Sequence, residues 1–249
     1  MMYDVNEAVF ISDLHLHPDM PEITQQFYEF IKWAAVYTKN IYILGDFFHV
    51  WPGDDAIDEW SGAIADQLAW LAAQGVAVYF MHGNRDFLLG NQFFARANLR
   101  KLPEASVIKL GQERVAVVHG DCYCTHDTGH QWLRRLTRNK LFSTLFLTLP
   151  YTFRARIVQQ VRQYSQTNRS KPLTKMEVVV PVMLRHLRRL RVHQVIHGHI
   201  HQPGLNLHTN KWGNYKQYVL SDWDEKPTLV CYNKSNKFHF IQFGGFYGS

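Results

Sequence analysis

Residues able to bind metal ions follow five separate apolar runs in this chain of 249 residues. They are carboxylate, imidazole and amide side chains: Asp13, His15, Asp46, Asn84, His119, His199 and His201. Any one of these motifs is a weak signal, because a lone Gly-Asp is a common turn and a lone histidine after a strand is usually structural. Five such motifs in one chain indicate a shared site.

The types of donor indicate which chemistry the site would perform. Oxygen and imidazole nitrogen without thiolate suit divalent ions such as Mn²⁺, Fe²⁺ or Zn²⁺. These seven donors exceed the needs of one ion, so we expect two ions, with a central carboxylate able to bridge them. Because paired ions hold a hydroxide and neutralise phosphoryl oxygens, the expected reaction is hydrolysis of a phosphoester.

The apolar runs that precede these residues predict buried strands, because they are short and rich in β-branched or aromatic residues. They cover residues 8–11, 41–44, 76–81, 115–118 and 195–196. Between the first three runs, apolar residues recur at helical spacing, in the sets Phe27, Ile31, Ala34 and Ile64, Leu68, Leu71. This alternation predicts an α/β layered fold, in which the carboxyl ends of the strands form one crevice.

Glycine stands beside the polar residue at four of the strand ends, as Gly45, Gly83, Gly120 and Gly198. Glycine permits a sharp turn and lets the backbone pass close to a bound ion. The glycines therefore favour the interpretation of these ends as ligand-binding loops.

The rest of the chain departs from the alternating pattern. Residues 205–208, 217–220, 228–232 and 238–243 predict an antiparallel meander that completes a second sheet. The segment from Gly129 to Pro172 predicts amphipathic helices broken at Pro150, inserted as a cap or lid. We therefore expect a core of residues 1–127 and 173–243, an inserted helical cap at 128–172 on which the metal centre does not depend, and a tail at 244–249.

Basic residues are concentrated in the predicted cap. The net charge is +6, and no acidic residue occurs between Asp127 and Glu177, a stretch that holds ten of the 27 lysines and arginines. This predicts an anionic partner, which could be a phosphorylated ligand, an anionic membrane surface or nucleic acid. A solvated face is the alternative, although such a face normally mixes both signs.

Cysteine usage and the absence of a leader pattern favour a cytoplasmic protein. Three cysteines cannot all pair, and Cys122 and Cys124 are too close for a routine bridge. With His126 and His130 they could form a zinc site, but the Cys-x-Cys spacing is not a standard structural pattern. The N-terminus lacks the basic residues of a secretory signal, and the longest apolar stretch, 141–153, is too short to cross a bilayer.

The order of Asp-x-His, Gly-Asp, Gly-Asn-Arg-Asp, His-Gly-Asp and Gly-His-x-His resembles the calcineurin-like metallophosphatase superfamily. The resemblance implies a two-sheet sandwich flanked by helices, and Mn²⁺ is the ion we expect. It also implies that Arg85 contacts the scissile phosphate as a catalytic residue. One ion would be held by Asp13, His15, Asp46 and His201, and the other by Asp46, Asn84, His119 and His199.

Finer motifs are similar to the UDP-2,3-diacylglucosamine hydrolases of lipid A biosynthesis. These motifs are Asp13-Leu14-His15-Leu16, Gly45-Asp46-Phe47-Phe48 followed by Trp51, and His119-Gly120-Asp121 followed by Cys124 and Asp127. The resemblance implies pyrophosphate hydrolysis to UMP and 2,3-diacylglucosamine 1-phosphate at the cytoplasmic face of the inner membrane. It implies substrate contacts from Asn84, Arg85, Asp127, Ser165, Asn168, Lys171 and His199. The chain departs from the family at His49, where an acidic residue is usual.

Two other functions stay open on the sequence alone. The metal centre could act on a soluble dinucleotide or nucleic acid held by the basic segment, although nucleic acid is not the partner we expect. The fold could instead serve as a scaffold that binds partners without turnover. The complete set of ligands favours an enzyme, because a scaffold has no need of all seven.

Overall fold

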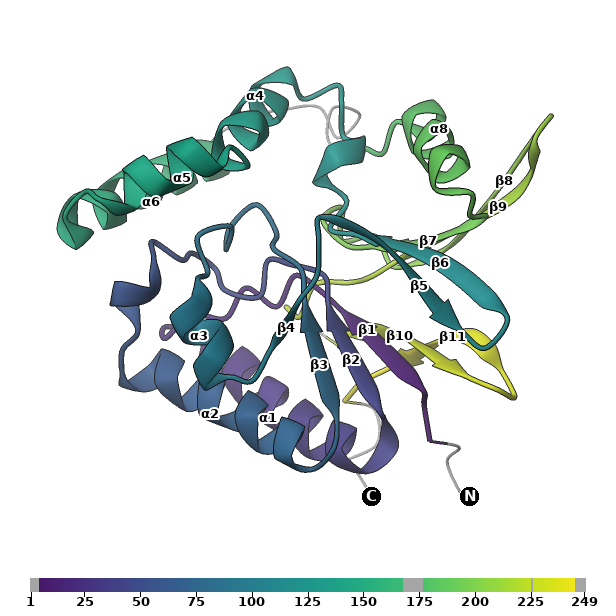
Figure 1. Ribbon diagram of the computed structural model, residues 1–249, viewed down its shortest axis with the longest axis horizontal. Helices are drawn as coiled ribbons and strands as arrows, with labels where there is room; N and C mark the ends of the chain where they lie inside the picture. The colour runs from purple at the N-terminus through teal and green to yellow at the C-terminus, as the bar shows by residue number, and fades with distance from the viewer. Residues whose placement is uncertain (1–4, 168–176, 225, 245–249) are drawn as a thin grey trace.

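The computed structural model describes residues 5–167, 177–224 and 226–244, with side chains described up to 161 in the first range. Two sheets pack face to face, with helices on their outer faces (Figure 1). The predicted α/β class and the two-sheet sandwich are both confirmed.

The first sheet has six strands in the order β11-β10-β1-β2-β3-β4. Strands β1 to β4 are parallel, whereas β10 pairs antiparallel with β1 and β11 antiparallel with β10. The strands are β1 (Ala8–Ile11), β2 (Asn40–Ile43), β3 (Ala77–Phe80), β4 (Arg100–Lys101), β10 (Thr228–Asn233) and β11 (Lys237–Gln242).

The second sheet has five strands in the order β5-β6-β7-β9-β8. Strands β6, β7 and β9 are parallel, and the edge strands β5 and β8 run antiparallel to their neighbours. The strands are β5 (Ala105–Leu110), β6 (Glu113–Val118), β7 (Gln194–His197), β8 (Gly204–Asn210) and β9 (Gly213–Val219).

The predicted meander in a single sheet is wrong. Strands β8 and β9 join the second sheet, but β10 and β11 join the first, where Phe10 pairs with Val230. The reason is burial on both faces of β10: Val230 and Tyr232 pack between the sheets, while Leu229 and Cys231 pack under the helices of the first sheet. If β10 were instead an outer strand of the second sheet, one of its two apolar faces would be exposed to water.

Helices cover the outer faces of both sheets. Helices α1 (Pro21–Tyr37), α2 (Glu59–Ala73) and α3 (Asn91–Arg96) lie on the first sheet, and α8 (Val180–Leu190) lies on the second. The spacing of Phe27 and Ile31 predicted α1 correctly, since both are buried. Helix α2 begins with a capping box between Asp58 and Ser61, which satisfies the first exposed amides of the helix.

Three further helices lie near the carboxyl ends of the parallel strands: α4 (Thr128–Thr137), α5 (Lys140–Leu147) and α6 (Tyr151–Thr167) (Figure 1). The predicted break at Pro150 is confirmed, because α5 ends at Leu147 and α6 begins directly after the proline. None of the described helices is long and apolar enough to span a bilayer.

Candidate metal centre

Six of the seven predicted metal ligands form two compact groups at the carboxyl ends of the parallel strands. The first group is Asp13, His15 and His201, and the second is Asp46, His119 and His199. Within each group, one donor atom of every residue lies within 4.8 Å of the others. Four strands that are distant in sequence, namely β1, β2, β6 and β7, thus bring together the residues that directly follow them.

Asp46 lies between the two groups and faces both. Its Oδ2 is 3.6 Å from His15 Nε2 of the first group, and its Oδ1 is 3.6 Å from His119 Nε2 of the second. A carboxylate placed in this way can offer one oxygen to each of two ions. This is the position that a bridging ligand requires.

The seventh predicted ligand, Asn84, joins the second group through His119. The Nδ1 atom of His119 is 2.8 Å from the backbone oxygen of Leu44, so Nδ1 must carry the hydrogen. In the neutral ring, Nε2 then has a lone pair directed at Asn84 Oδ1, which is 2.9 Å away. Two acceptors do not face each other at this distance unless a proton or a cation lies between them. A proton on Nε2 or a bound cation satisfies this geometry, so the pair is compatible with the predicted role of both residues as ligands.

Unsatisfied polar atoms also fit bound ions. Asp13 Oδ2 accepts hydrogen bonds from Ser12 Oγ at 2.6 Å and from the backbone amide of His199 at 2.9 Å. By contrast, Asp13 Oδ1 and His15 Nε2 are buried and make no well-formed hydrogen bond; their nearest polar groups are His201 Nε2, 3.3 Å from Oδ1, and Asp46 Oδ2, 3.6 Å from His15 Nε2. Buried polar atoms are normally paired, so these two are placed for a ligand that the protein itself does not supply.

The backbone of the site is strained at its ligands. Only eight described residues other than glycine have a positive φ, and five of them are predicted ligands: Asp13, His15, Asp46, His199 and His201. Their φ angles lie between 49° and 69°, in the left-handed region that costs a residue with a Cβ of order 1–3 kcal/mol. Such strain concentrates at functional sites.

Two of the predicted glycines leave room for the central carboxylates. A Cβ on Gly83 would lie 2.1 Å from Asp46 Oδ1, and a Cβ on Gly198 would lie 2.0 Å from Asp13 Oδ2. The expected close approach of the backbone is therefore real, although the groups approached are the carboxylates themselves. Gly45 has φ +89° and packs on the backbone of Gly83.

Positive groups surround Asp46. Burial by itself would raise the pKa of this carboxyl, but nearby His119, His15 and Arg85 hold its pKa well below the ordinary value. The Nε of Arg85 is 3.1 Å from Asp46 Oδ2, and its backbone amide donates to Asp46 Oδ1 at 2.9 Å. The site is therefore built to keep Asp46 ionised.

Asp222 is a site residue that sequence reasoning missed. Its Oδ2 is 3.0 Å from Nδ1 of His201, whose Nε2 points to Asp13 Oδ1 at 3.3 Å. A carboxylate behind a histidine fixes the ring and raises its basicity as a ligand. Asp222 follows β9, as the other site residues follow their strands, and this was the available signal.

The predicted substrate contacts of Asp127, at the start of the cap, and of the cap itself are only partly described. The side chain of Asp127 caps α4 by accepting a hydrogen bond from the backbone amide of His130 at 3.1 Å. Ser165 lies in α6 beyond the last described side chain of that helix. Asn168 and Lys171 lie outside the described residues.

Four further histidines divide into structural and candidate functional residues. His82 Nε2 donates to the oxygen of Leu89 at 2.7 Å, and burial lowers its pKa to about 4. His197 pairs with Gly198 O and with Gln217, and burial also lowers its pKa to about 4. These two are satisfied core histidines.

The other two histidines differ in burial. His126 is exposed. His130 places its ring 5.3 Å from the ring of His199, and its buried Nε2 has no hydrogen-bond partner. The zinc hypothesis for these residues gains no support, because neither of the two ligand groups found among the described residues contains a cysteine. Burial raises the pKa of Cys124 to about 12.

Asp54, in the segment Gly53-Asp54-Asp55, connects two loops that lie next to the ligand groups. Asp54 accepts hydrogen bonds from the amides that begin α3, including Gly90 at 2.7 Å and Gln92 at 2.8 Å. It also accepts from Trp51 Nε1 at 3.0 Å. The loop after β2 is thereby anchored to the loop after β3, which carries Asn84 and Arg85.

Comparison with known proteins agrees with this geometry. The sequence pattern of the calcineurin-like phosphoesterases matches residues 8–203, which include all the residues of both ligand groups. The chain belongs to the calcineurin-like phosphoesterase family. Phosphoesterases of this family use divalent metal ions, for which the two groups are the candidate sites.

Within the calcineurin-like phosphoesterases, this chain is similar to proteins named UDP-2,3-diacylglucosamine hydrolase. The protein of Aeromonas salmonicida is 42% identical over 226 residues, covering 90% of this chain and 89% of its own. The protein of Proteus mirabilis is 36% identical over 237 residues, covering 95% of this chain and 98% of its own. The resemblance read from the motifs is confirmed.

Proposed function

We propose that this protein hydrolyses the pyrophosphate bond of UDP-2,3-diacylglucosamine, giving UMP and 2,3-diacylglucosamine 1-phosphate in lipid A biosynthesis. The observation that carries the proposal is the pair of ligand groups joined by Asp46. It is supported by relatives named UDP-2,3-diacylglucosamine hydrolase, which match this chain over 89% and 98% of their own length.

Two divalent ions, with Mn²⁺ favoured, are assigned to the seven predicted ligands. Bound there, the ions would supply an activated water and positive charge for the phosphoryl oxygens. One ion is assigned to Asp13, His15, Asp46 and His201, and the other to Asp46, Asn84, His119 and His199. Oxygen and nitrogen donors without thiolate are compatible with Mn²⁺, and the resemblance to the metallophosphatases is the reason for preferring it to Fe²⁺ or Zn²⁺.

The protein's own side chains complete the proposed chemistry. Arg85 is the proposed catalytic residue, because its largely buried guanidinium lies beside Asp46 and can pair with phosphoryl oxygens. Asp222 holds the His201 ring in its ligand orientation. The proposed substrate contacts are Asn84, Arg85, Asp127, Ser165, Asn168, Lys171 and His199.

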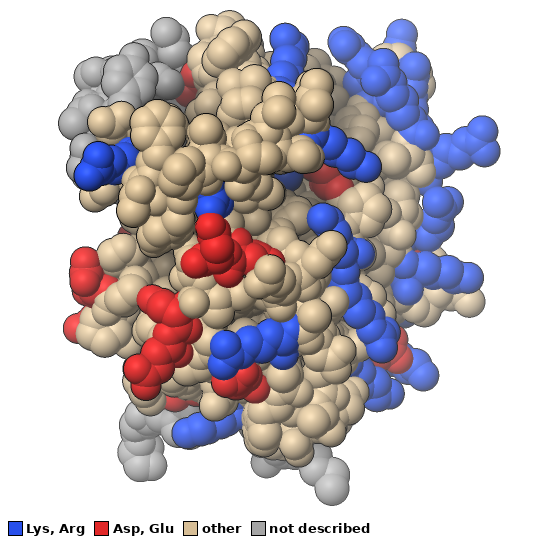
Figure 2. Space-filling view, turned by 60° about the vertical axis from the view of Figure 1, so that its left-hand side comes forward, with Lys and Arg blue, Asp and Glu red and all other residues tan. Residues whose placement is uncertain are grey.

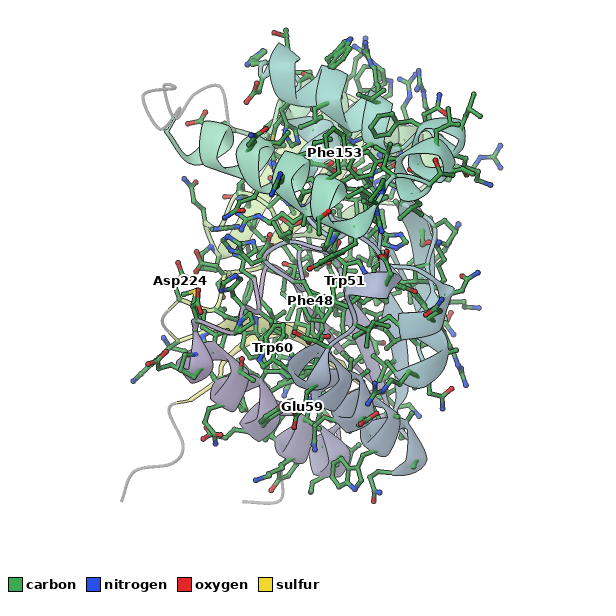
Figure 3. The ribbon with its side chains drawn as sticks, turned by 90° about the vertical axis from the view of Figure 1, so that its left-hand side faces the viewer. Phe48, Trp51, Glu59, Trp60, Phe153 and Asp224 are labelled. Carbon is green, nitrogen blue, oxygen red and sulfur yellow. The ribbon has the colours of Figure 1, made fainter. Side chains whose placement is uncertain are left out.

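A cavity beside the first ligand group supports an acylated substrate. It has a volume of about 390 Å³, and it is lined on one side by Trp51 and Trp60 and on the other by Tyr151 of α6. His49, whose ring lies 6.4 Å from that of His15, lines the same cavity, so it opens close to the metal centre. Figure 3 shows Phe48, Trp51 and Trp60 between α2 and the helices that cover the site. The walls mix apolar side chains such as Trp51 and Trp60 with polar ones such as Asp58 and Gln159, so an acyl chain would contact the apolar part of the cavity.

The outer surface of the covering helices supports an association with the cytoplasmic face of the inner membrane. Leu145 is 60% exposed and Phe153 is 52% exposed, in a segment with no acidic side chain. Apolar side chains among basic residues favour an anionic bilayer surface. We therefore propose a cytoplasmic, peripherally bound enzyme, with residues 128–172 as its cap and a lipid-linked sugar nucleotide rather than nucleic acid as its partner.

The direct test supplies the purified protein with Mn²⁺ and UDP-2,3-diacylglucosamine and measures UMP. We expect turnover that a chelator abolishes and Mn²⁺ restores. Asp46→Ala is the negative control, and we expect its activity to fall by more than roughly 100-fold, beyond the loss typical of an outer-shell partner. Faster cleavage of a soluble dinucleotide than of the acylated substrate would contradict the lipid assignment.

A further inference from the structure

Helix α4 differs from α5 and α6 in what it contacts. Residues on or next to α4 contact three loops that carry predicted metal ligands, namely the loops after β3, β6 and β7. We infer that α4, ended by Arg138, is a positioning element of the metal centre and not part of a separable lid. The inference rests on the proposed metal-dependent function, and it departs from the expectation that the centre is independent of residues 128–172.

Arg138 makes the closest connection to a ligand. Its Nη2 donates to the backbone oxygens of His82 and Gly83, both at 3.1 Å. These are the two residues directly before Asn84. Gly83 in turn packs against Asp46 with no room for a Cβ. A shift of this loop would therefore displace both Asn84 and the carboxylate of Asp46.

Gln131 and Arg134 connect α4 to the loop that follows His119. Gln131 Nε2 donates to the backbone oxygen of Asp121 at 2.7 Å. The carboxylate of Asp121 is 1% exposed and lies 3.2 Å from Arg134 Nε and 3.9 Å from Arg138 Nη2. A buried carboxylate needs positive partners, and α4 supplies both of them. Glu104, just before β5, pairs with Arg134 from the other side.

His130 connects α4 to the third loop. Its ring packs on His199 at a centroid distance of 5.3 Å, and His199 packs on His119 at 5.0 Å. The three rings form a continuous line of contacts from α4 into the second ligand group, tilted at 33° between His130 and His199 and edge-on at 67° between His199 and His119. The orientation of His199 therefore depends on α4 as well as on its own strand.

The contacts of α5 and α6 with the core are of another kind. Arg154 of α6 pairs with Asp55 and donates to the oxygen of Pro52, and Phe146 of α5 packs against the core of the first sheet. In the part of the chain with described side chains, neither helix shows a hydrogen bond or ion pair to a predicted ligand or to its two chain neighbours. The boundary between positioning element and lid therefore falls after Arg138.

The test compares Arg138→Ala with Arg135→Ala. Arg135 is an exposed arginine of the same helix, so both variants lose the same charge and only one loses the contact with the loop before Asn84. Mn²⁺ binding is measured by calorimetry and by electron paramagnetic resonance, and turnover is measured with the soluble ester bis(4-nitrophenyl) phosphate. We expect Arg138→Ala to bind Mn²⁺ about 10-fold more weakly than the parent, the loss typical of an outer-shell partner. Arg135→Ala should match the parent.

Arg138→Lys provides the second variant, because it keeps the charge but has a single ammonium in place of the guanidinium fork. We expect Mn²⁺ affinity between that of the parent and that of Arg138→Ala, and this variant decides the question if Arg138→Ala does not fold. Equal Mn²⁺ affinity and turnover in the parent and the Arg138 variants would overturn the inference. A parent that neither binds Mn²⁺ nor cleaves the ester would instead overturn the proposed function.

Discussion

At the scale of single residues, the site combines strained ligands with carboxylates that are held ionised. Asp13, His15, Asp46, His199 and His201 all have a left-handed backbone, which no run of ordinary residues adopts without compensation. The compensation includes hydrogen bonds from neighbouring amides, such as those of His199 to Asp13 and of Arg85 to Asp46. A bound ion would add to it, since the ligands are already placed and little reorganisation is needed.

Arg85 is the residue whose substitution tests catalysis apart from metal binding. We expect Arg85→Ala to lower kcat by roughly 100-fold with a smaller change in KM, because charge on the phosphoryl oxygens is best compensated in the transition state. Steady-state kinetics with the acylated substrate measures both constants, and the Mn²⁺ content of the variant serves as the control. A rise in KM alone would show that Arg85 only anchors the ground state.

At the scale of elements, the loops that follow β3 and β7 are packed too closely to admit a larger residue in place of Gly83 and Gly198. Gly83 follows β3 and meets Asp46 at the end of β2, while Gly198 follows β7 and meets Asp13 at the end of β1. The loop after β3 thus holds the carboxylate of its neighbour β2, and the loop after β7 holds the carboxylate that follows β1 of the facing sheet. This packing places the backbone of Gly83 and Gly198 directly against Asp46 and Asp13, with Arg85 as the long side chain beside Asp46.

Gly83→Ala tests this packing. We expect it to abolish tight Mn²⁺ binding and to destabilise the fold by about 1–3 kcal/mol, because a Cβ would overlap Asp46. The matched control is Gly75→Ala, where φ is +91° but a Cβ would meet nothing within 4 Å. Thermal melts should show that both variants lose stability, while calorimetry should show that only Gly83→Ala loses Mn²⁺ binding. Unchanged Mn²⁺ affinity in Gly83→Ala would contradict the close packing.

At the scale of the whole molecule, charge is divided between two parts of the chain. Residues 128–221 hold 16 of the 27 basic residues and a single acidic one, Glu177. This stretch includes α8, where Arg185, Arg188 and Arg189 are exposed, so the basic surface is wider than the predicted cap. Figure 2 shows acidic side chains gathered on one part of the visible face and basic side chains along its opposite edge. Such a division can orient the molecule on an anionic surface.

Vesicle binding tests this orientation. We expect the protein to sediment with phosphatidylglycerol vesicles but not with phosphatidylcholine vesicles, and to be released as salt is raised from 0.01 M to about 1 M, where the screening length falls to about 3 Å. Leu145→Asp should weaken binding several-fold. Val36→Asp is the matched control, because Val36 is 63% exposed but lies on α1. Equal loss in both variants would exclude a docking role for α5.

The sequence by itself determined the chemistry of this protein, because ligand type and the strand or turn around each ligand are local properties of the chain. The motifs from Asp13 to His201 indicated a two-metal phosphoesterase, and the apolar periodicity predicted the strands and helices that position them. Regular spacing also predicted α1 and α2, and Pro150 predicted the break between α5 and α6. These features need only neighbouring residues to be recognised.

Only the tertiary structure decided which distant segments meet. The pairing of β10 with β1, the placement of Asp222 behind His201 and the contact of Arg138 with the loop before Asn84 each join residues far apart in sequence. An apolar strand such as β10 can complete either sheet until burial on both of its faces selects one. The place of Asp222 after a strand is a signal in the sequence, but its partner His201 is not, and Arg138 looks like any surface residue until the fold supplies its partner, because both roles depend on long-range packing.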